Sequence, residues 1–165
     1  MNKRVAVAFT GPSGSGKTTL VEKVSKQMIK DNRVAIIKND PKDKANFDVE
    51  GKDSDKFTKT GAEVVITSPT RTTYFSQREK TLDDIVAMIS DFDILLVEGL
   101  KTLPLPRIAV FRNTIDLDYL SCSEAIAIDE SIDIGQYNIP SNIDILDLNN
   151  TLQIIEWITN NSKEL

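Results

Sequence analysis

The chain of 165 residues contains no histidine and a single cysteine, Cys122. The lack of histidine removes the commonest general base and a frequent ligand of transition metals. One cysteine excludes an intramolecular disulfide and any multi-cysteine metal site, which fits a reducing compartment. Chemistry in this protein must therefore use carboxylates, lysines, hydroxyls and backbone amides, with a hard cation where a metal takes part.

Long apolar runs and an excess of positive charge are also missing. No run approaches the ~20 apolar residues of a membrane helix, and the start of the chain lacks the pattern of a signal peptide. The 20 lysines and arginines are outnumbered by 25 acidic residues, and the formal net charge of −5 gives no reason to expect nucleic acid or an anionic membrane as partner. We therefore expect a soluble, cytoplasmic protein that binds neither.

Glycine and proline are scarce, at seven and six residues, and no internal repeat or Gly/Ser/Pro linker divides the chain. Helical patterns cover residues 17–30, 81–90 and 151–160, and in the second Thr81 and Asp84 have the spacing of a capping box. Continuous apolar runs, typical of strands buried on both faces of a parallel sheet, cover 4–9, 33–38, 62–68, 93–99, 107–111, 124–129 and 143–148. We predict one α/β domain over residues 1–165, a three-layer P-loop NTPase fold with a mostly parallel central sheet flanked by helices.

The segment "GPSGSGKT", residues 11–18, matches G-x-x-x-x-G-K-[ST], the phosphate-binding P-loop, between a predicted strand and a predicted helix. Its glycines allow a tight backbone turn whose amides converge on phosphate oxygens at the positive end of the helix. Lys17 is expected at the β- and γ-phosphates, and the Thr18 hydroxyl on Mg²⁺. The expected nucleotide contacts are Gly11, Ser13, Gly14, Ser15, Gly16, Lys17, Thr18 and Thr19.

A second acid at a strand end is needed to hold the cation. Glu98 follows four apolar residues in "DILLVEG" and should emerge at the carboxyl end of a buried strand, where ligands bind in such sheets. The alternative is that Glu98 only caps its strand. Asp93, at the opposite end of the same run, is the weaker candidate.

The polar segment 39–61 interrupts the alternation and ends in a short predicted helix stopped by Gly61. Within it Asp40 follows the second strand and is a candidate catalytic residue, either binding Mg²⁺ through water or orienting an attacking water; a solvated loop carboxylate is the alternative. Lys38 and Lys101 follow strand ends and would counter phosphate charge unless they are ordinary surface lysines. Arg71, Arg78 and Arg112 are candidate anion contacts without a spacing argument.

Four segments together resemble the MobB family of P-loop proteins: "FTGPSGSGKTTLVEKV", "RVAIIKND", "GKDSDKFTKTGAEVVI" and "DILLVEGLKTLPLPRIAVFR". The resemblance runs over residues 3–112. It implies a homodimer that binds GTP with Mg²⁺, hydrolyses it weakly, and assists the nucleotidyltransferase MobA in attaching GMP to molybdopterin. It also maps Lys17, Thr18 and Glu98 onto the P-loop lysine and the two metal ligands, and Asp53 onto a nucleotide- or partner-facing aspartate.

The chain departs from the family pattern in two places. Family members commonly carry histidines after the second strand, where this chain has "KNDPKDK" with Asp40 and Asp43. No [NT]-K-x-D guanine-recognition motif is present, so guanine specificity follows from the resemblance alone.

Three functions remain open on the sequence. The first is the GTP-binding accessory protein of molybdenum cofactor biosynthesis, a weak Mg²⁺-dependent GTPase. The second is a small-molecule or nucleotide P-loop kinase, for which Arg71 and Arg78 approach an arginine lid. The third is a non-catalytic adaptor in which residues 39–61 respond to the nucleotide.

Overall fold

A computed structural model describes residues 3–165 and divides them into two compact units, residues 3–39 with Asp91–Leu165, and Asp40–Ser90. Each unit is described by itself. The single domain expected over residues 1–165 stays a prediction. No helix among the described residues combines the length and the apolar character that crossing a membrane requires.

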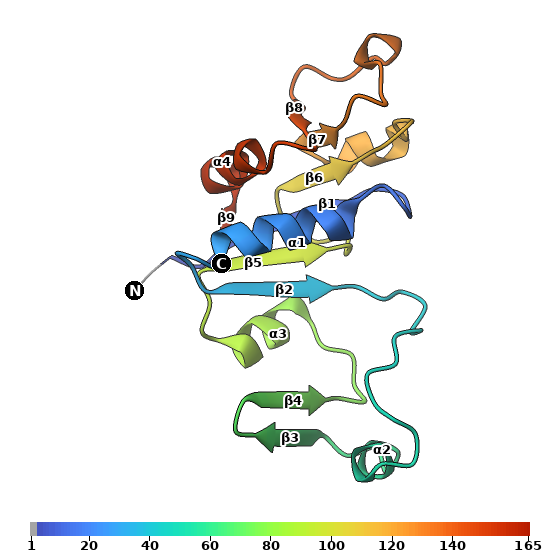
Figure 1. Cartoon of the computed structure of the whole chain (residues 1–165), viewed down its shortest axis with the longest axis vertical. Coiled ribbons are helices and arrows are strands. Elements are labelled where there is room, and N and C mark those ends of the chain that lie inside the picture. Colours follow the sequence, from blue (N-terminus) through green and yellow to red (C-terminus); the bar gives the residue numbers. More distant parts are fainter. Residues whose placement is uncertain (1–2) are drawn as a thin grey trace. The chain divides into compact units, whose positions relative to one another are not determined.

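The larger unit is built on one sheet in the order β2–β5–β1–β6–β7–β8 (Figure 1), in which all neighbouring strands are parallel. The strands are β1 (Val5–Thr10), β2 (Val34–Lys38), β5 (Ile94–Glu98), β6 (Arg107–Val110), β7 (Ala125–Ile128) and β8 (Asp144–Asp147). A short antiparallel strand, β9 (Lys163–Glu164), pairs with the start of β1. The predicted central sheet is thus confirmed, and six of the seven predicted strands lie in it.

Continuous apolar runs form these strands because both faces of the sheet are covered. Along β6 and the residue after it, Ile108 and Val110 point to one core cluster, and Ala109 and Phe111 to another on the opposite face. All four side chains are fully buried. This alternation places a hydrophobic layer on each side of the sheet.

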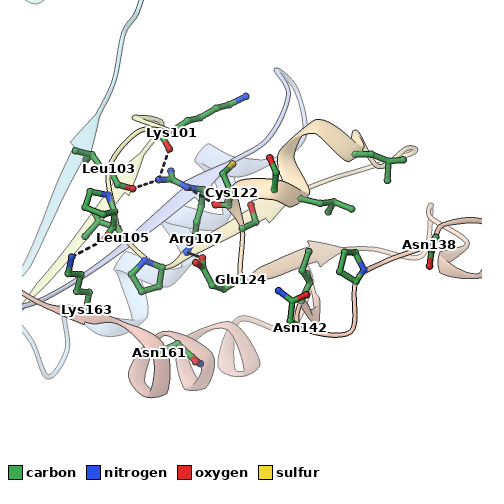
Figure 2. A pocket seen from close by; sticks show the side chains of 18 residues that line it. Lys101, Leu103, Leu105, Arg107, Cys122, Glu124, Asn138, Asn142, Asn161 and Lys163 are labelled. Carbon is green, nitrogen blue, oxygen red and sulfur yellow. Dashed lines mark hydrogen bonds between the residues drawn. The ribbon is translucent and has the colours of Figure 1, made fainter.

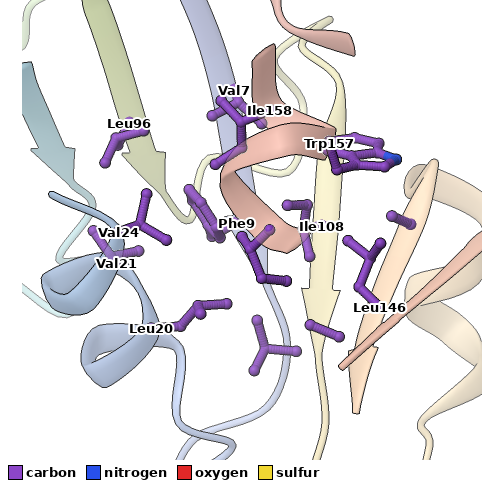
Figure 3. Close-up of a cluster of buried hydrophobic side chains, with 14 of the residues drawn as sticks. Val7, Phe9, Leu20, Val21, Val24, Leu96, Ile108, Leu146, Trp157 and Ile158 are labelled. Carbon is purple, nitrogen blue, oxygen red and sulfur yellow. The ribbon is translucent and has the colours of Figure 1, made fainter. Parts of the chain in front are cut away.

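One face is covered by α1 (Lys17–Met28) and α4 (Thr151–Asn161), which contact each other. Figure 3 shows side chains of both helices converging on those of β1, β5, β6 and β8. The helical spacing predicted the buried face of α1, and its members Leu20, Val21, Val24 and Met28 are all buried. In α4, the Trp157 indole donates to Asp144 Oδ2 at 2.7 Å, which ties the helix to β8.

The opposite face is covered by irregular structure and two 3₁₀ helices, η1 (Leu117–Cys122) and η2 (Ile134–Gln136), which periodicity did not predict. Phe111 and Tyr119 meet there edge to face with ring centroids 5.9 Å apart. Short 3₁₀ turns begin at capping aspartates, Asp116 and Asp133, and carry too few residues for a periodic signal.

The smaller unit contains α2 (Asp53–Thr58), α3 (Leu82–Ile89) and a two-stranded antiparallel sheet of β3 (Val64–Ser68) and β4 (Arg71–Phe75). The capping box predicted for α3 is present: the Asp84 amide donates to Thr81 Oγ1, and the Thr81 amide donates to Asp84 Oδ2. The predicted short helix before Gly61 is α2, and Gly61 has a φ of 83°.

The expectation for residues 62–68 was wrong. The run forms a strand, but β3 lies in the separate hairpin instead of the parallel sheet, and its partner β4 was not predicted. Val65 is 57% exposed. A short apolar run does not reveal how many of its faces are covered, since its pairing depends on a partner elsewhere in the chain.

Candidate functional site

The P-loop connects β1 to α1, as the motif requires. Gly11, Gly14 and Gly16 have φ values of 131°, 79° and 95°, in the range that side chains rarely adopt. At Gly11 a Cβ atom would lie 2.3 Å from the backbone oxygen of Val110 in the neighbouring strand. Glycine at this position therefore lets the loop pass directly over the end of β6.

Lys17 opens α1, and its ammonium group donates to the backbone oxygens of Gly11 at 2.8 Å and Pro12 at 2.7 Å. Partial burial is the main cause that lowers the pKa of Lys17. The Glu98 carboxylate opposes this shift, and the charges of Lys38 and Lys101 add to it. A phosphate group would favour the charged lysine more strongly than carbonyl oxygens do, because it carries a full negative charge.

Ser15 supplies a direct indication that this loop fits an oxygen-rich ligand. Ser15 is 4% exposed, and its hydroxyl is buried without a hydrogen-bond partner in the structure. Unpaired buried polar groups are costly and uncommon. The first amides of α1 likewise have no acceptor within the helix. Ser13, Gly14, Thr18 and Thr19 are exposed around the same loop, where a phosphate chain can reach them.

Glu98 ends β5, which lies directly beside β1, and Phe9 is its register partner. The Glu98 residue is 8% exposed. The Thr18 hydroxyl lies 3.2 and 3.3 Å from its two carboxylate oxygens, and the Lys38 ammonium lies 2.9 Å from Oε1. The residues expected to hold Mg²⁺, Thr18 and Glu98, are therefore in contact, and both offer the oxygen donors that this cation prefers.

Glu98 and Asp93, the two candidate acids of this run, lie at opposite ends of β5 and have different partners. Glu98 emerges at the P-loop end of β5, where it contacts α1 and β2. Asp93 lies at the amino end, where its carboxylate binds the Arg33 guanidinium, with Oδ1 2.8 Å from one terminal nitrogen. The two candidate lysines also have different partners. Lys38 pairs with Glu98. Lys101 lies over the Tyr119 ring, with its nitrogen 3.5 Å from the ring centroid.

Asp40 and Asp53 belong to the smaller unit, and their predicted roles stay predictions. Asp40 Oδ2 accepts hydrogen bonds from the backbone amides of Lys44 and Ala45, both at 2.7 Å, so the carboxylate shapes its own loop. Asp53 begins α2 and pairs with Lys56 at 3.3 Å. Among the arginines considered for a kinase lid, Arg78 is paired with Glu63 at 2.7 Å.

Two arginines that carried no spacing signal have defined places in the larger unit. Arg112, after β6, lies against the P-loop: a Cβ atom at Gly16 would be 3.4 Å from its Nε atom. Arg107, at the start of β6, is 1% exposed and donates to five backbone oxygens, those of Gly99, Leu100, Lys101, Leu103 and Cys122.

Arg107 therefore fixes the segment that directly follows Glu98 (Figure 2). It also lines a cavity of about 1050 Å³ beside the amino ends of β6, β7 and β8. This cavity is not the P-loop site, because none of the P-loop residues lines it. Burial lowers the pKa of Arg107, the charge of Glu124 opposes this shift, and five backbone carbonyls accept hydrogen bonds from the guanidinium.

Comparison with known proteins agrees with this architecture. The model of the MobB family, described as molybdopterin guanine dinucleotide synthesis protein B, matches residues 6–129. The molybdopterin-guanine dinucleotide biosynthesis adapter protein of Haemophilus influenzae is 33% identical over 169 residues, covering 97% of this chain and 91% of that protein. The adapter protein of the same description from Escherichia coli is 30% identical and covers 92% of each chain.

Solved structures extend the similarity to the fold. The crystal structure of Bacillus subtilis MobB superposes with a TM-score of 0.74 at 18% identity, covering 96% of this chain and 98% of that one. The P-loop NTPase fold supports a role in binding nucleotide and Mg²⁺. With a family match over residues 6–129 and full-length relatives of this similarity, the chain belongs to the MobB family.

Proposed function

We propose that this protein is a GTP-binding adapter of molybdenum cofactor biosynthesis, which assists the conversion of molybdopterin to molybdopterin guanine dinucleotide. The observation that carries the proposal is the convergence of Lys17, Thr18 and Glu98 at one end of the sheet, beside a glycine-rich loop with an unpaired buried hydroxyl. The names of the relatives supply the pathway.

In this proposal the P-loop amides and Lys17 bind the β- and γ-phosphates. Lys17 leaves the carbonyls of Gly11 and Pro12 to do so, and Ser15 gains an acceptor. Thr18 and Glu98 would hold Mg²⁺, which would supply charge neutralisation at the phosphates. Lys38 would then give up its contact with Glu98 and could turn toward phosphate oxygens.

Hydrolysis, where it occurs, is expected to be slow. Glu98, the carboxylate in contact with the P-loop helix, is engaged by Thr18 and Lys38 and is therefore not available as a general base. Asp40 is our candidate for orienting a water molecule. Catalysis would then consist of positioning and electrostatic stabilisation of the transferred group.

The partners we propose are a MobA-type nucleotidyltransferase, molybdopterin or its molybdenum form, and a second copy of this chain in a homodimer. No nucleic acid or membrane partner is proposed, because the net charge of −5 disfavours both. The runner-up function, a small-molecule or nucleotide kinase, loses support from the pairing of Arg78 with Glu63, which engages one of its two lid arginines.

Isothermal titration with GTP and with ATP, each with and without Mg²⁺, tests the proposal. We expect Mg²⁺-dependent binding with preference for GTP, lost in Lys17→Ala and made insensitive to Mg²⁺ in Glu98→Gln. Lys23→Ala is the matched control, since Lys23 lies on the exposed side of the same helix. Absence of binding to either nucleotide would contradict the proposal, and ATP preference with transfer of phosphate to an added acceptor would support the kinase.

A pull-down with a MobA-type nucleotidyltransferase, in the presence and in the absence of GTP and Mg²⁺, tests the adapter role separately. We expect capture by the wild-type protein and weaker capture by Lys17→Ala. Equal capture with and without nucleotide would show that the association does not depend on the P-loop.

A further inference from the structure

The side of the P-loop away from Glu98 carries a charged side chain that the proposed phosphate and metal contacts do not use. Sheet order puts β5 on one side of β1 and β6 on the other, so Glu98 and Arg112 flank the P-loop from opposite sides. The guanidinium of Arg112 lies beside Gly16, where a Cβ atom would be 3.4 Å from Nε and 3.6 Å from Cζ.

Arg112 is held in this place by a carboxylate from the next strand. Its Nε atom lies 3.1 Å from Asp129 Oδ2, and Asp129 follows β7. The other Asp129 oxygen accepts from the Ser131 hydroxyl, which in turn accepts from the Asn113 amide at 2.7 Å. The bond from Ser131 is the main cause that lowers the pKa of Asp129, with a smaller contribution from Arg112, so the carboxylate stays ionised at neutral pH.

The loop that carries Arg112 is fixed on its far side as well. Tyr137 places its hydroxyl 3.2 Å from the Thr114 hydroxyl and accepts from the Ile115 amide at 3.3 Å. Ile115 is itself buried in the core cluster of this face. The two loops after β6 and β7 therefore form a preformed wall, and a ligand against it would not have to order them.

The charge on Arg112 is already paired, which argues against a phosphate clamp. The Asp129 side chain is 11% exposed, and that of Arg112 is 42% exposed, so the guanidinium rather than the carboxylate faces solvent. A guanidinium is planar and weakly hydrated, and it stacks well on aromatic faces. The terminal phosphates and the cation are already assigned to Lys17, Thr18 and Glu98 on the other side of the loop.

We propose that Arg112, positioned by Asp129, stacks on the purine base of the bound nucleotide. This inference rests on the proposed nucleotide-binding function. It assigns the base to a part of the chain that contains no guanine-recognition motif, since stacking uses the face of the ring and not its hydrogen-bonding edge.

The test compares GTP with inorganic tripolyphosphate, which lacks the base, by calorimetric titration in the presence of Mg²⁺. Arg112→Ala should weaken GTP about tenfold and leave tripolyphosphate unchanged, because only GTP presents an aromatic ring. Arg112→Lys should recover less than half of the lost binding free energy, since it restores the charge without the planar group. Arg33→Ala is the matched control: it removes another carboxylate-paired arginine, at the amino end of β2.

Each alternative has its own signature. Equal weakening of GTP and tripolyphosphate would make Arg112 a phosphate contact and overturn the inference, and so would unchanged GTP affinity or full recovery in Arg112→Lys. If Arg112→Ala does not fold, Asp129→Asn takes its place, because it keeps the side-chain shape and weakens the ion pair that positions Arg112. This variant should lower the affinity for GTP and leave the affinity for tripolyphosphate unchanged. A wild-type protein that binds neither ligand would instead refute the proposed function itself.

Discussion

The contact of Gly11 with β6 leads to a quantitative prediction for Gly11→Ala. A methyl group at this position would lie 2.3 Å from the Val110 oxygen and 3.2 Å from the Val110 nitrogen, both backbone atoms of a buried strand. Ordinary contact begins near 3.4 Å, so the loop must move by about 1 Å. The neighbouring backbone cannot yield as a flexible side chain would.

A displacement of about 1 Å in a positioning group costs on the order of 100-fold in function. Alanine at a positive φ strains the nucleotide-bound loop by about 1–2 kcal/mol, and because the free loop can relax, this strain lowers GTP affinity by up to roughly 5- to 30-fold. Gly14→Ala separates the two effects, since Gly14 also has a positive φ but nothing lies within 4 Å of the added atom. We expect GTP affinity to fall about tenfold in Gly14→Ala and at least 100-fold in Gly11→Ala.

Titration calorimetry measures both affinities, and circular dichroism with a thermal midpoint checks that each variant keeps its fold. The reasoning fails if folded Gly11→Ala binds GTP within threefold of Gly14→Ala, because the contact with Val110 would then impose no displacement on the phosphate-binding backbone.

The partly buried Lys17 and the buried Arg107 each lead to a further prediction. The pKa of Lys17 is lowered in the free protein, mainly by burial, and phosphate should raise it. Bound protein then holds more protons, so GTP affinity should be constant below the pKa of the free lysine and fall about tenfold per unit as pH rises through it. Titrations from neutral to alkaline pH measure this, and an affinity that stays constant over that whole range would contradict it. Arg107→Leu should lower the free energy of unfolding by roughly 3 kcal/mol or more, because it leaves buried carbonyls unpaired. Urea unfolding measures this loss, and a loss below about 1 kcal/mol would show that water replaces the guanidinium.

The sequence was most informative where the chemistry is local. The glycines, Lys17 and Thr18 lie within eight residues, and the flanking strand and helix are specified by their own apolar patterns. Glu98 was found because a continuous apolar run ends at it, and in a parallel sheet the end of such a run marks the ligand-binding edge. These predictions required no knowledge of which strand pairs with which.

Pairing between distant segments could not be derived in this way. Residues 62–68 have the same apolar character as the buried strands, yet β3 pairs with β4 in a separate two-stranded sheet, since strand propensity does not encode the number of covered faces. The 3₁₀ helices η1 and η2 were missed because each is too short to show a period.

Local sequence thus determined the P-loop, its helix and the candidate metal acid, because their geometry depends on neighbouring residues along the chain. Only the tertiary structure decided that Lys38 contacts Glu98, that Arg107 fixes the segment after it, and that Arg112 lies beside Gly16. An isolated arginine or lysine in a sequence has no periodic or spacing signal. The partner of such a residue depends on the order of strands in the sheet. That order in turn depends on how the whole chain buries both faces of the sheet.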